Sequence, residues 1–381
     1  MTGPKSRETK YSLSQVYFYL TEGCNLACRH CWLAPQYQPG ENKSAVLDFE
    51  LFRSILEQAK PLGLTTVKLT GGEPLMHPRI REILSLVRTS GFRLVIETNG
   101  VLCTAEIAKL IASCRNPFVS VSLDGVDAAT HEWVRGVAGC FESALTGIHH
   151  LVRSGLKPQI IMSLMQRNKL QVEGMVHLAE FLEAGSVKFN PVQPVERGMK
   201  MHESDEALDV HELVDLGRWV DTKLSAATKL HLFFHYPAAF RSFSRIFSHS
   251  DGGCGTCGIK RIIGVLSNGC YALCGIGTSV DELVFGHAGK DTLANVWYEN
   301  PILNRIRAGV PDNLEGICRN CILKNLCLGS CIAQNYYRTK NLFAPFWLCE
   351  EAYKEGLFPR SRISATTTTS NAKKVMNSTI V

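Results

Sequence analysis

The sequence has no apolar run of the roughly 18 residues that a membrane-spanning helix needs. It also lacks an apolar stretch of the secretory type near its N-terminus, which reads MTGPKSRETKYSLSQ. A strong charge bias is missing too, because 41 basic and 35 acidic residues leave a net charge of only +6. These absences predict a cytoplasmic protein whose partners include neither nucleic acid nor a membrane.

Cysteine is the exception in this otherwise ordinary composition, and the chain carries 15 of them. Three lie at 24–31, nine lie between 254 and 349, and three stand alone at Cys103, Cys114 and Cys140. Disulfides are not expected because the cytosol keeps thiols reduced. The clustered cysteines therefore indicate metal ligands, whereas the isolated ones are expected to be small buried hydrophobes.

Between residues 15 and 200, short apolar runs alternate with amphipathic stretches. This alternation predicts parallel strands joined by helices, in an open doubly wound sheet or in a partial or full barrel. The chemistry of such folds lies at the C-terminal ends of the strands. The six strands are expected at Gln15–Leu20, Thr65–Leu69, Arg93–Glu97, Phe118–Ser122, Gln159–Ser163 and Ser186–Asn190.

Outside this region the periodicity weakens, and the chain is expected to divide into five parts. A bridging region should contain a helix near Asp209–Lys223 and a strand through Leu230–Phe234. The cysteine-dense part should be a small domain held together by metal more than by a large core. The parts are an N-terminal extension at 1–14, the βα region at 15–200, the bridge at 201–250, the cysteine-rich domain at 251–355 and a disordered tail at 356–381.

The first cysteine motif, Cys24-x3-Cys28-x2-Cys31, follows the first expected strand directly. Three thiolates can hold three irons of a cubane and leave the fourth iron open for a substrate or cofactor. The alternative is a structural zinc loop. Zinc prefers four closed ligands, and the one nearby candidate for a fourth, His30, lies between two of the cysteines.

This motif, with an aromatic-rich flank after the first strand of a βα series, resembles the signature of the radical S-adenosylmethionine (SAM) superfamily. The resemblance covers about residues 15–200 and implies a partial (β/α)6 barrel with SAM and a 4Fe–4S cluster at its mouth. It also implies SAM contacts at the ends of successive strands. These positions are His30, then Gly71, Gly72, Glu73 and Pro74, then Thr98 and Asn99, then Ser122 and Asp124, and finally Arg135.

The C-terminal cysteines resemble the SPASM extension of that superfamily, which binds two auxiliary 4Fe–4S clusters. Cys318-x2-Cys321-x5-Cys327-x3-Cys331 is followed by Cys349, and Gly269 precedes Cys274 by five positions. The resemblance assigns one cluster to Cys254, Cys257, Cys274 and Cys331, and the other to Cys318, Cys321, Cys327 and Cys349. Cys270 could replace Cys254 or Cys257, and a pair of zinc knuckles is the alternative to the two clusters.

The resemblance implies an oxidoreductase that cleaves SAM to a 5′-deoxyadenosyl radical and abstracts hydrogen from a ribosomally made peptide, forming a thioether or a carbon–carbon crosslink. One alternative is an anaerobic formylglycine maturase, but its general base should follow the residue aligned with Cys274, where this chain has Gly275. A cofactor-assembly enzyme, for instance for haem, and a non-catalytic Fe–S carrier are further alternatives. The sequence singles out no catalytic side chain for the substrate reaction.

The expected partners follow from this chemistry. They are a precursor peptide or protein as substrate, and an electron donor such as flavodoxin or ferredoxin. Only about fourteen residues precede the first strand, so leader recognition is expected from a separate protein or from the enzyme's own surface.

Overall fold

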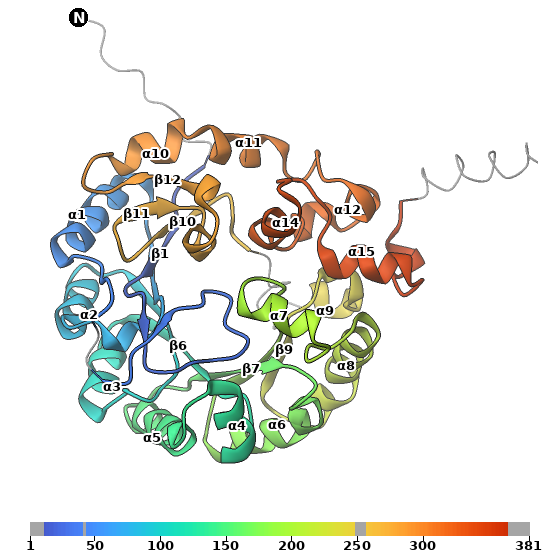
Figure 1. Cartoon of the computed structure of the whole chain (residues 1–381), viewed down its shortest axis with the longest axis horizontal. Coiled ribbons are helices and arrows are strands. Elements are labelled where there is room, and N and C mark those ends of the chain that lie inside the picture. The colour runs from blue at the N-terminus through green and yellow to red at the C-terminus, as the bar shows by residue number, and fades with distance from the viewer. Residues whose placement is uncertain (1–10, 41–42, 248–256, 365–381) are drawn as a thin grey trace, which may run out of the picture.

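The computed structural model describes residues 11–40, 43–247 and 257–364, and these contain all the elements given below. The fold is built on one ten-stranded sheet that curls around a central space, with helices on its outer side (Figure 1). The strand order is β12-β11-β10-β1-β4-β5-β6-β7-β8-β9. All neighbours from β10 to β9 are parallel, and β11 and β12 add an antiparallel edge.

The six expected strands are all present, and their bounds agree with the expectation to within a few residues. The strand expected in the bridging region is also present and extends the same sheet as β9. The strands are β1 (Gln15–Tyr19), β4 (Thr66–Thr70), β5 (Arg93–Thr98), β6 (Arg115–Ser122), β7 (Gln159–Leu164), β8 (Ser186–Pro191) and β9 (His231–Phe234). The partial barrel that the resemblance implied is therefore confirmed.

The helices between these strands begin at caps that the sequence provides. Asp48 accepts hydrogen bonds from the backbone N–H groups of Glu50 and Leu51, and Asp209 forms a capping box with Glu212. The helices of the βα region and of the bridge are α1 (Phe49–Ala59), α2 (Ile80–Thr89), α3 (Ala105–Ala112), α4 (Ala128–Arg135), α5 (Cys140–Arg153), α6 (Val172–Phe181), α7 (Arg197–Glu203), α8 (Val210–Thr222) and α9 (Phe243–Phe247).

The cysteine-rich part joins the barrel through backbone hydrogen bonds. β10 (Ile262–Val265) pairs in parallel with β1, and β11 (Cys270–Ala272) and β12 (Val284–His287) continue from it (Figure 1). Its helices are α10 (Leu293–Glu299), α11 (Pro301–Gly309), α12 (Gly316–Asn320), α13 (Lys324–Cys327), α14 (Ile332–Thr339) and α15 (Trp347–Lys354).

This part contributes more apolar core than the sequence led us to expect. Trp297 on α10 is fully buried, and it belongs to the same continuous apolar cluster as Phe18 on β1. The short periodic segments hid this core because each helix buries at most four apolar residues, and α13 buries none.

The expected tail begins later than residue 356. Phe358 is buried, and Arg362 donates hydrogen bonds to the backbone carbonyls of Ala239 and Arg241. These contacts hold residues 356–364 against the bridging region, while 365–381 lie outside the described residues. Among the helices that the structure describes, none is long and apolar enough to cross a membrane.

Candidate functional site

A cavity of about 660 Å³ opens inside the barrel, and Cys24, Cys28 and Cys31 lie on its wall. They belong to the segment after β1, which includes the short strand β2 (Gly23–Cys24) paired with β3 (Gln36–Tyr37). The backbone N–H groups of Ala27 and Arg29 donate to the carbonyls of Arg135 and Val134, over 2.9 and 3.0 Å. The cysteine segment is thus fixed to the end of α4.

Two glycines after β4 let the backbone approach this segment closely. A Cβ atom on Gly72 would lie 2.0 Å from the carbonyl oxygen of Gly23, and Gly71 has a φ of +133°. No other residue fits Gly72 without moving backbone. Both glycines line the cavity, as the resemblance implied, whereas Pro74 starts a short 3-10 helix and does not line it.

Glu73 lines the cavity, but its carboxylate also has partners within the protein. One oxygen accepts from Thr98 Oγ1 over 2.7 Å and from the Leu75 N–H over 3.0 Å, and the other accepts from the Asn99 N–H over 2.8 Å. Burial raises the pKa of Glu73, and these hydrogen bonds oppose the rise. Glu73 therefore holds the ends of β4 and β5 together.

Asn99 lies beside the first cysteine. Its side-chain nitrogen donates to Asn25 Oδ1 over 2.8 Å and approaches Cys24 Sγ at 3.9 Å. Ser122 lines the cavity, and so does His30, whose Nε2 lies 3.1 Å from Ser163 Oγ. Burial lowers the pKa of His30 to about 4, so the ring is neutral at pH 7.

Asp124 and Arg135 form a buried ion pair behind the cavity wall. Their nearest atoms are 2.7 Å apart, and Asp124 also accepts from the Ser163 N–H over 2.7 Å. Burial acts to raise the pKa of Asp124, but Arg135 and then His30 hold it below its usual value. Arg135 reaches the cavity and donates to Cys28 Sγ over 3.5 Å, whereas Asp124 does not line it.

A second set of cysteines lies on another part of the same cavity wall. Cys257, Cys274 and Cys331 all line it, although they are far apart in the sequence. Burial, followed by the nearby Cys331, raises the pKa of Cys257 to about 12, and the same two causes raise the pKa of Cys274. Cys254, the expected fourth member, lies outside the described residues.

Cys270 lies apart from this set. It is partly exposed on β11, where it pairs with His287, and it does not line the cavity. The structure therefore favours Cys257 over Cys270 as a member of the set.

The third set, Cys318, Cys321, Cys327 and Cys349, lines a separate small cavity near α12, α13 and α15. The thiols of Cys318 and Cys349 are hydrogen-bonded, which lowers the pKa of Cys318 and raises the pKa of Cys349. The Phe346 N–H donates to Cys318 Sγ over 3.4 Å, as backbone amides do to thiolates.

These groupings fit iron–sulfur clusters better than single zinc ions. Among the residues that the structure describes, no three Cys, His, Asp or Glu side chains converge as ligands of one metal ion. A cubane binds its thiolates through separate irons, and the chain gathers cysteines in sets of three and four around two cavities.

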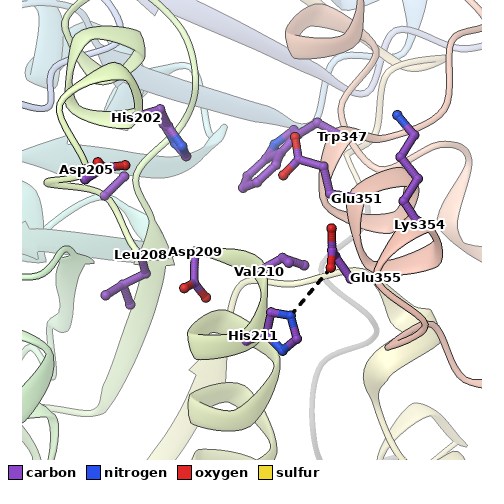
Figure 2. Close-up of a pocket in the computed structure, with 11 residues that line it drawn as sticks. His202, Asp205, Leu208, Asp209, Val210, His211, Trp347, Glu351, Lys354 and Glu355 are labelled. Carbon is purple, nitrogen blue, oxygen red and sulfur yellow. Dashed lines mark ion pairs between the residues drawn. The ribbon is translucent and has the colours of Figure 1, made fainter.

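Another cavity, of about 440 Å³, lies on the surface between the α7–α8 segment and α15 (Figure 2). His211 and Glu355 form an exposed ion pair across it, with their nearest atoms 3.9 Å apart. Such a pair contributes little to stability. None of the cysteines lines this cavity, and we assign it no role.

Comparison with known proteins accords with this arrangement. A model of the radical SAM superfamily matches residues 18–182. The chain is 27% identical over 356 residues to the AdoMet-dependent heme synthase of Methanosarcina barkeri, a match that covers 89% of this chain and 95% of that protein. It is 26% identical over 351 residues to the mycofactocin maturase MftC of Mycobacterium tuberculosis, covering 90% and 84%. Residues 18–182 of this chain form a radical SAM domain.

A solved structure shows the same fold as this radical SAM enzyme. SuiB of Streptococcus suis, bound to its precursor peptide SuiA, gives a TM-score of 0.69 at 19% identity, over 89% of this chain and 76% of SuiB. A radical SAM domain implies SAM and a 4Fe–4S cluster as cofactors. Its cysteine-rich C-terminal part agrees with a SPASM extension.

The sequence interpretation of this radical SAM enzyme missed the polar side chains inside the barrel. Lys68 on β4, Glu97 on β5 and Lys188 on β8 all line the cavity, as does His235 just after β9. The signal was present, because strands of a buried parallel sheet normally read as continuous apolar runs. A charged residue in the middle of such a strand indicates that its side chain faces an interior space.

Proposed function

We propose that this enzyme matures a ribosomally made peptide, using SAM to form a thioether or a carbon–carbon crosslink. The observation that carries the proposal is that two sets of cysteines, at 24–31 and at 257, 274 and 331, open on to one cavity. A substrate in that cavity would lie between the site of SAM cleavage and a second redox centre.

In this proposal the three cysteine sets hold three 4Fe–4S clusters. When bound, the first cluster supplies the electron that cleaves SAM to methionine and a 5′-deoxyadenosyl radical. The two auxiliary clusters would accept or relay electrons. The proposed ligands are Cys24, Cys28 and Cys31 for the first, Cys254, Cys257, Cys274 and Cys331 for the second, and Cys318, Cys321, Cys327 and Cys349 for the third.

The chain's own contribution is to position SAM and to exclude water. Gly71 and Gly72 bring the backbone close to the SAM methionine, Glu73 accepts from its ammonium, and Arg135 faces its carboxylate. Ser122, Thr98 and Asn99 bind the remaining polar groups, and His30 packs near the adenine. The cavity inside the barrel would hold the substrate within reach of the SAM site.

Formylglycine formation is the less supported reading. A Cβ atom on Gly275 would lie 2.4 Å from Tyr19 Cε1 and 2.6 Å from Leu33 Cδ2. Other side chains thus occupy the space that the side chain of a general base would need at position 275. The chain therefore lacks both the base and the room for it.

Haem assembly is a second candidate, supported by the full-length similarity to the AdoMet-dependent heme synthase. The lysines inside the barrel would suit the acidic side chains of a porphyrin. We prefer peptide modification for two reasons. The match to the maturase MftC covers as much of this chain as the match to the heme synthase does, and SuiB, which has the same fold, was solved with its precursor peptide bound.

Several further statements are part of the proposal. The electron donor would be a flavodoxin or ferredoxin, and the leader would be bound by a separate protein or by the enzyme's own surface. The division at residues 200, 250 and 355 would separate the SAM-cleaving, bridging and cluster-bearing parts.

The test begins with reconstituted, reduced enzyme and SAM under anaerobic conditions. We expect 5′-deoxyadenosine, and none from a Cys24/Cys28/Cys31→Ala variant. With a precursor peptide we expect a product that has lost two hydrogens per crosslink, seen by mass spectrometry. Heme formed from an iron coproporphyrin, with the peptide unchanged, would replace the proposal with the second candidate. No 5′-deoxyadenosine above background would overturn both.

A further inference from the structure

Three polar side chains on one wall of the barrel cavity have no partners in the described structure. Lys188 and Asn190 lie on β8, and His235 follows β9; all three line the cavity. Lys188 has no ion pair or hydrogen bond with the described residues, and Asn190 Oδ1 is buried without a hydrogen bond. Buried polar groups are normally satisfied, so the buried Asn190 Oδ1 lacks a hydrogen-bond donor that a ligand could supply.

The backbone places the three side chains together. Residues 188 and 190 are two apart on one strand and so face the same side of the sheet. β9 runs parallel to β8 with Phe234 opposite Phe189, and the His235 N–H donates to the Phe189 carbonyl over 2.8 Å. His235 therefore lies next to Asn190 on the cavity side.

Positive charge exceeds negative charge at this place. Lys68 is already paired with Glu97, with 2.7 Å between their nearest atoms, and Thr70 Oγ1 donates to the other oxygen of Glu97 over 3.5 Å. Burial lowers the pKa of Lys188; Glu97 opposes this, and the neighbouring cations Lys68 and Arg241 lower it further. An additional anion would offset this excess.

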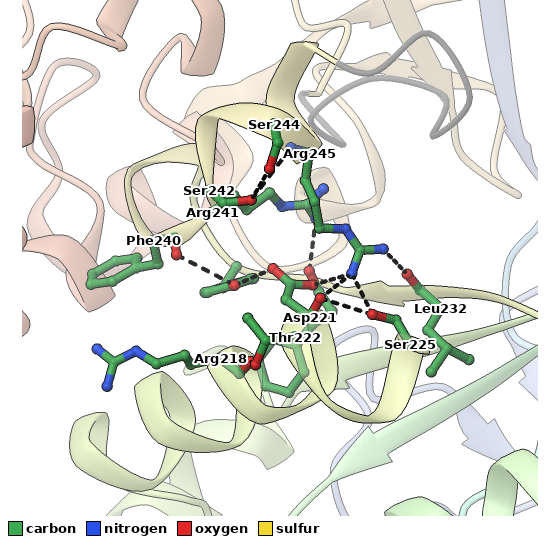
Figure 3. Close-up of polar contacts among 12 residues, drawn as sticks. Arg218, Asp221, Thr222, Ser225, Leu232, Phe240, Arg241, Ser242, Ser244 and Arg245 are labelled. Atoms are coloured by element: carbon green, nitrogen blue, oxygen red, sulfur yellow. Dashed lines mark hydrogen bonds and ion pairs between the residues drawn. The ribbon is translucent and has the colours of Figure 1, made fainter. Parts of the chain in front are cut away.

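Hydrogen bonds from Arg245 tie β9, the strand that precedes His235, to α8 (Figure 3). Arg245 donates to the carbonyl of Asp221 on α8 over 2.8 Å and to the carbonyl of Leu232 on β9 over 3.3 Å. Arg241 donates to the Phe234 carbonyl over 2.8 Å. These bonds fix the end of β9, so His235 is held in position before a ligand arrives.

We propose that Lys188, Asn190 and His235 form a subsite for a carboxylate of the substrate. This inference rests on the proposed function, because it places the substrate in the cavity that SAM shares. The ammonium and the neutral imidazole donate to the carboxylate, and Asn190 Oδ1 accepts from a neighbouring N–H of the ligand. A peptide has both a carboxylate and such N–H groups, which favours a peptide over a porphyrin as their source.

The test uses the reconstituted full chain with three pairs of probes. The first pair is glutarate and glutaramide, whose binding is followed by saturation-transfer NMR. The second pair is a hexapeptide acid and its C-terminal amide, and the third is iron coproporphyrin III and its methyl ester. Binding of the second and third pairs is measured by calorimetry. We expect the carboxylate forms to bind at least about tenfold more tightly, since hydrogen bonds to charged groups contribute about 1.5–3 kcal/mol. Lys188→Met should remove this preference, and Lys188→Arg should largely retain it.

Lys109→Met, the same change at an exposed position on α3, is the matched control and should behave as wild type. SAM affinity and 5′-deoxyadenosine formation without substrate should be unchanged in Lys188→Met, which also shows that the variant folds. His235→Gln should weaken carboxylate binding less than Lys188→Met does.

Equal binding of acids and amides, or full carboxylate binding by Lys188→Met, would overturn the subsite. A weaker SAM affinity in Lys188→Met would also overturn it, because the ammonium would then serve SAM. If iron coproporphyrin III bound and the peptide acid did not, the carboxylate subsite would stand, but its ligand would be a porphyrin and not a peptide. Absence of 5′-deoxyadenosine with carboxylate binding intact would count against the proposed function only.

Discussion

Arg135 joins the first cysteine segment to the barrel wall, because its guanidinium donates to Cys28 Sγ over 3.5 Å while its ion pair with Asp124 spans 2.7 Å. Both side chains are buried, at 7% and 0% exposure. Arg135 thus positions Cys28, a proposed cluster ligand, and pairs with the buried carboxylate of Asp124 just after β6.

Arg135→Gln is expected to destabilise the enzyme. The change leaves Asp124 buried without its ion pair, which costs about 3–5 kcal/mol. Denaturant unfolding of the wild type and the variant measures the difference. Arg53→Gln, which breaks the exposed pair with Glu50, should cost no more than about 1 kcal/mol. An Arg135→Gln/Asp124→Asn double variant should recover part of the loss, and equal effects of the Arg53 and Arg135 changes would contradict this account.

Substitution of Gly275 should be damaging and should yield no formylglycine activity. Its Cβ would meet Tyr19 and Leu33 at 2.4 and 2.6 Å, so Gly275→Ala should cost about 1–3 kcal/mol through overpacking. Gly275→Asp should cost more, because it also brings a carboxylate. Thermal unfolding measures both effects, and a fully stable Gly275→Asp enzyme that oxidises a sulfatase-type peptide would show that the base can be accommodated.

Iron counts should separate Cys257 from Cys270. Cys257→Ala removes a member of the set that lines the main cavity, so we expect it to lose up to about one cluster in three. Cys270→Ala should keep its iron because Cys270 lies outside the set. Mössbauer and iron analysis of the two reconstituted variants provide the measurement. Iron loss in Cys270→Ala with full iron in Cys257→Ala would reverse the assignment.

Removal of iron should unfold the cysteine-rich C-terminal segment at an earlier stage than it unfolds the barrel. Helices α12, α13 and α15 meet around Cys318, Cys321, Cys327 and Cys349, and metal binding at such a site contributes to folding free energy. Anaerobic chelation should therefore produce early proteolytic cuts between residues 316 and 354, mapped by mass spectrometry. The iron-loaded enzyme is the control, and first cuts in the α1–α6 region would argue against this role.

The sequence predicted the βα region well because its signals are local. The strand through Ser186–Asn190 and the helix near Asp209–Lys223 both appear as expected, since the periodicity of apolar residues is read from neighbouring positions. The pairing of β10 with β1 was not foreseen, because it joins residues far apart in the chain. Lys188 was missed for a different reason: a charged residue within an apolar strand was not interpreted as facing an interior space.

The pairing of β10 with β1 also bears on how the protein is made. β1 leaves the ribosome early, but the strand that covers one of its edges is among the later parts to be synthesised. Until then, that edge and the adjoining cysteine segment lack their final neighbour, and an open strand edge readily recruits other chains. Fragments that stop before Ile262 should therefore associate with one another. The nascent chain is protected from such association only after β10 has been synthesised and has paired with β1.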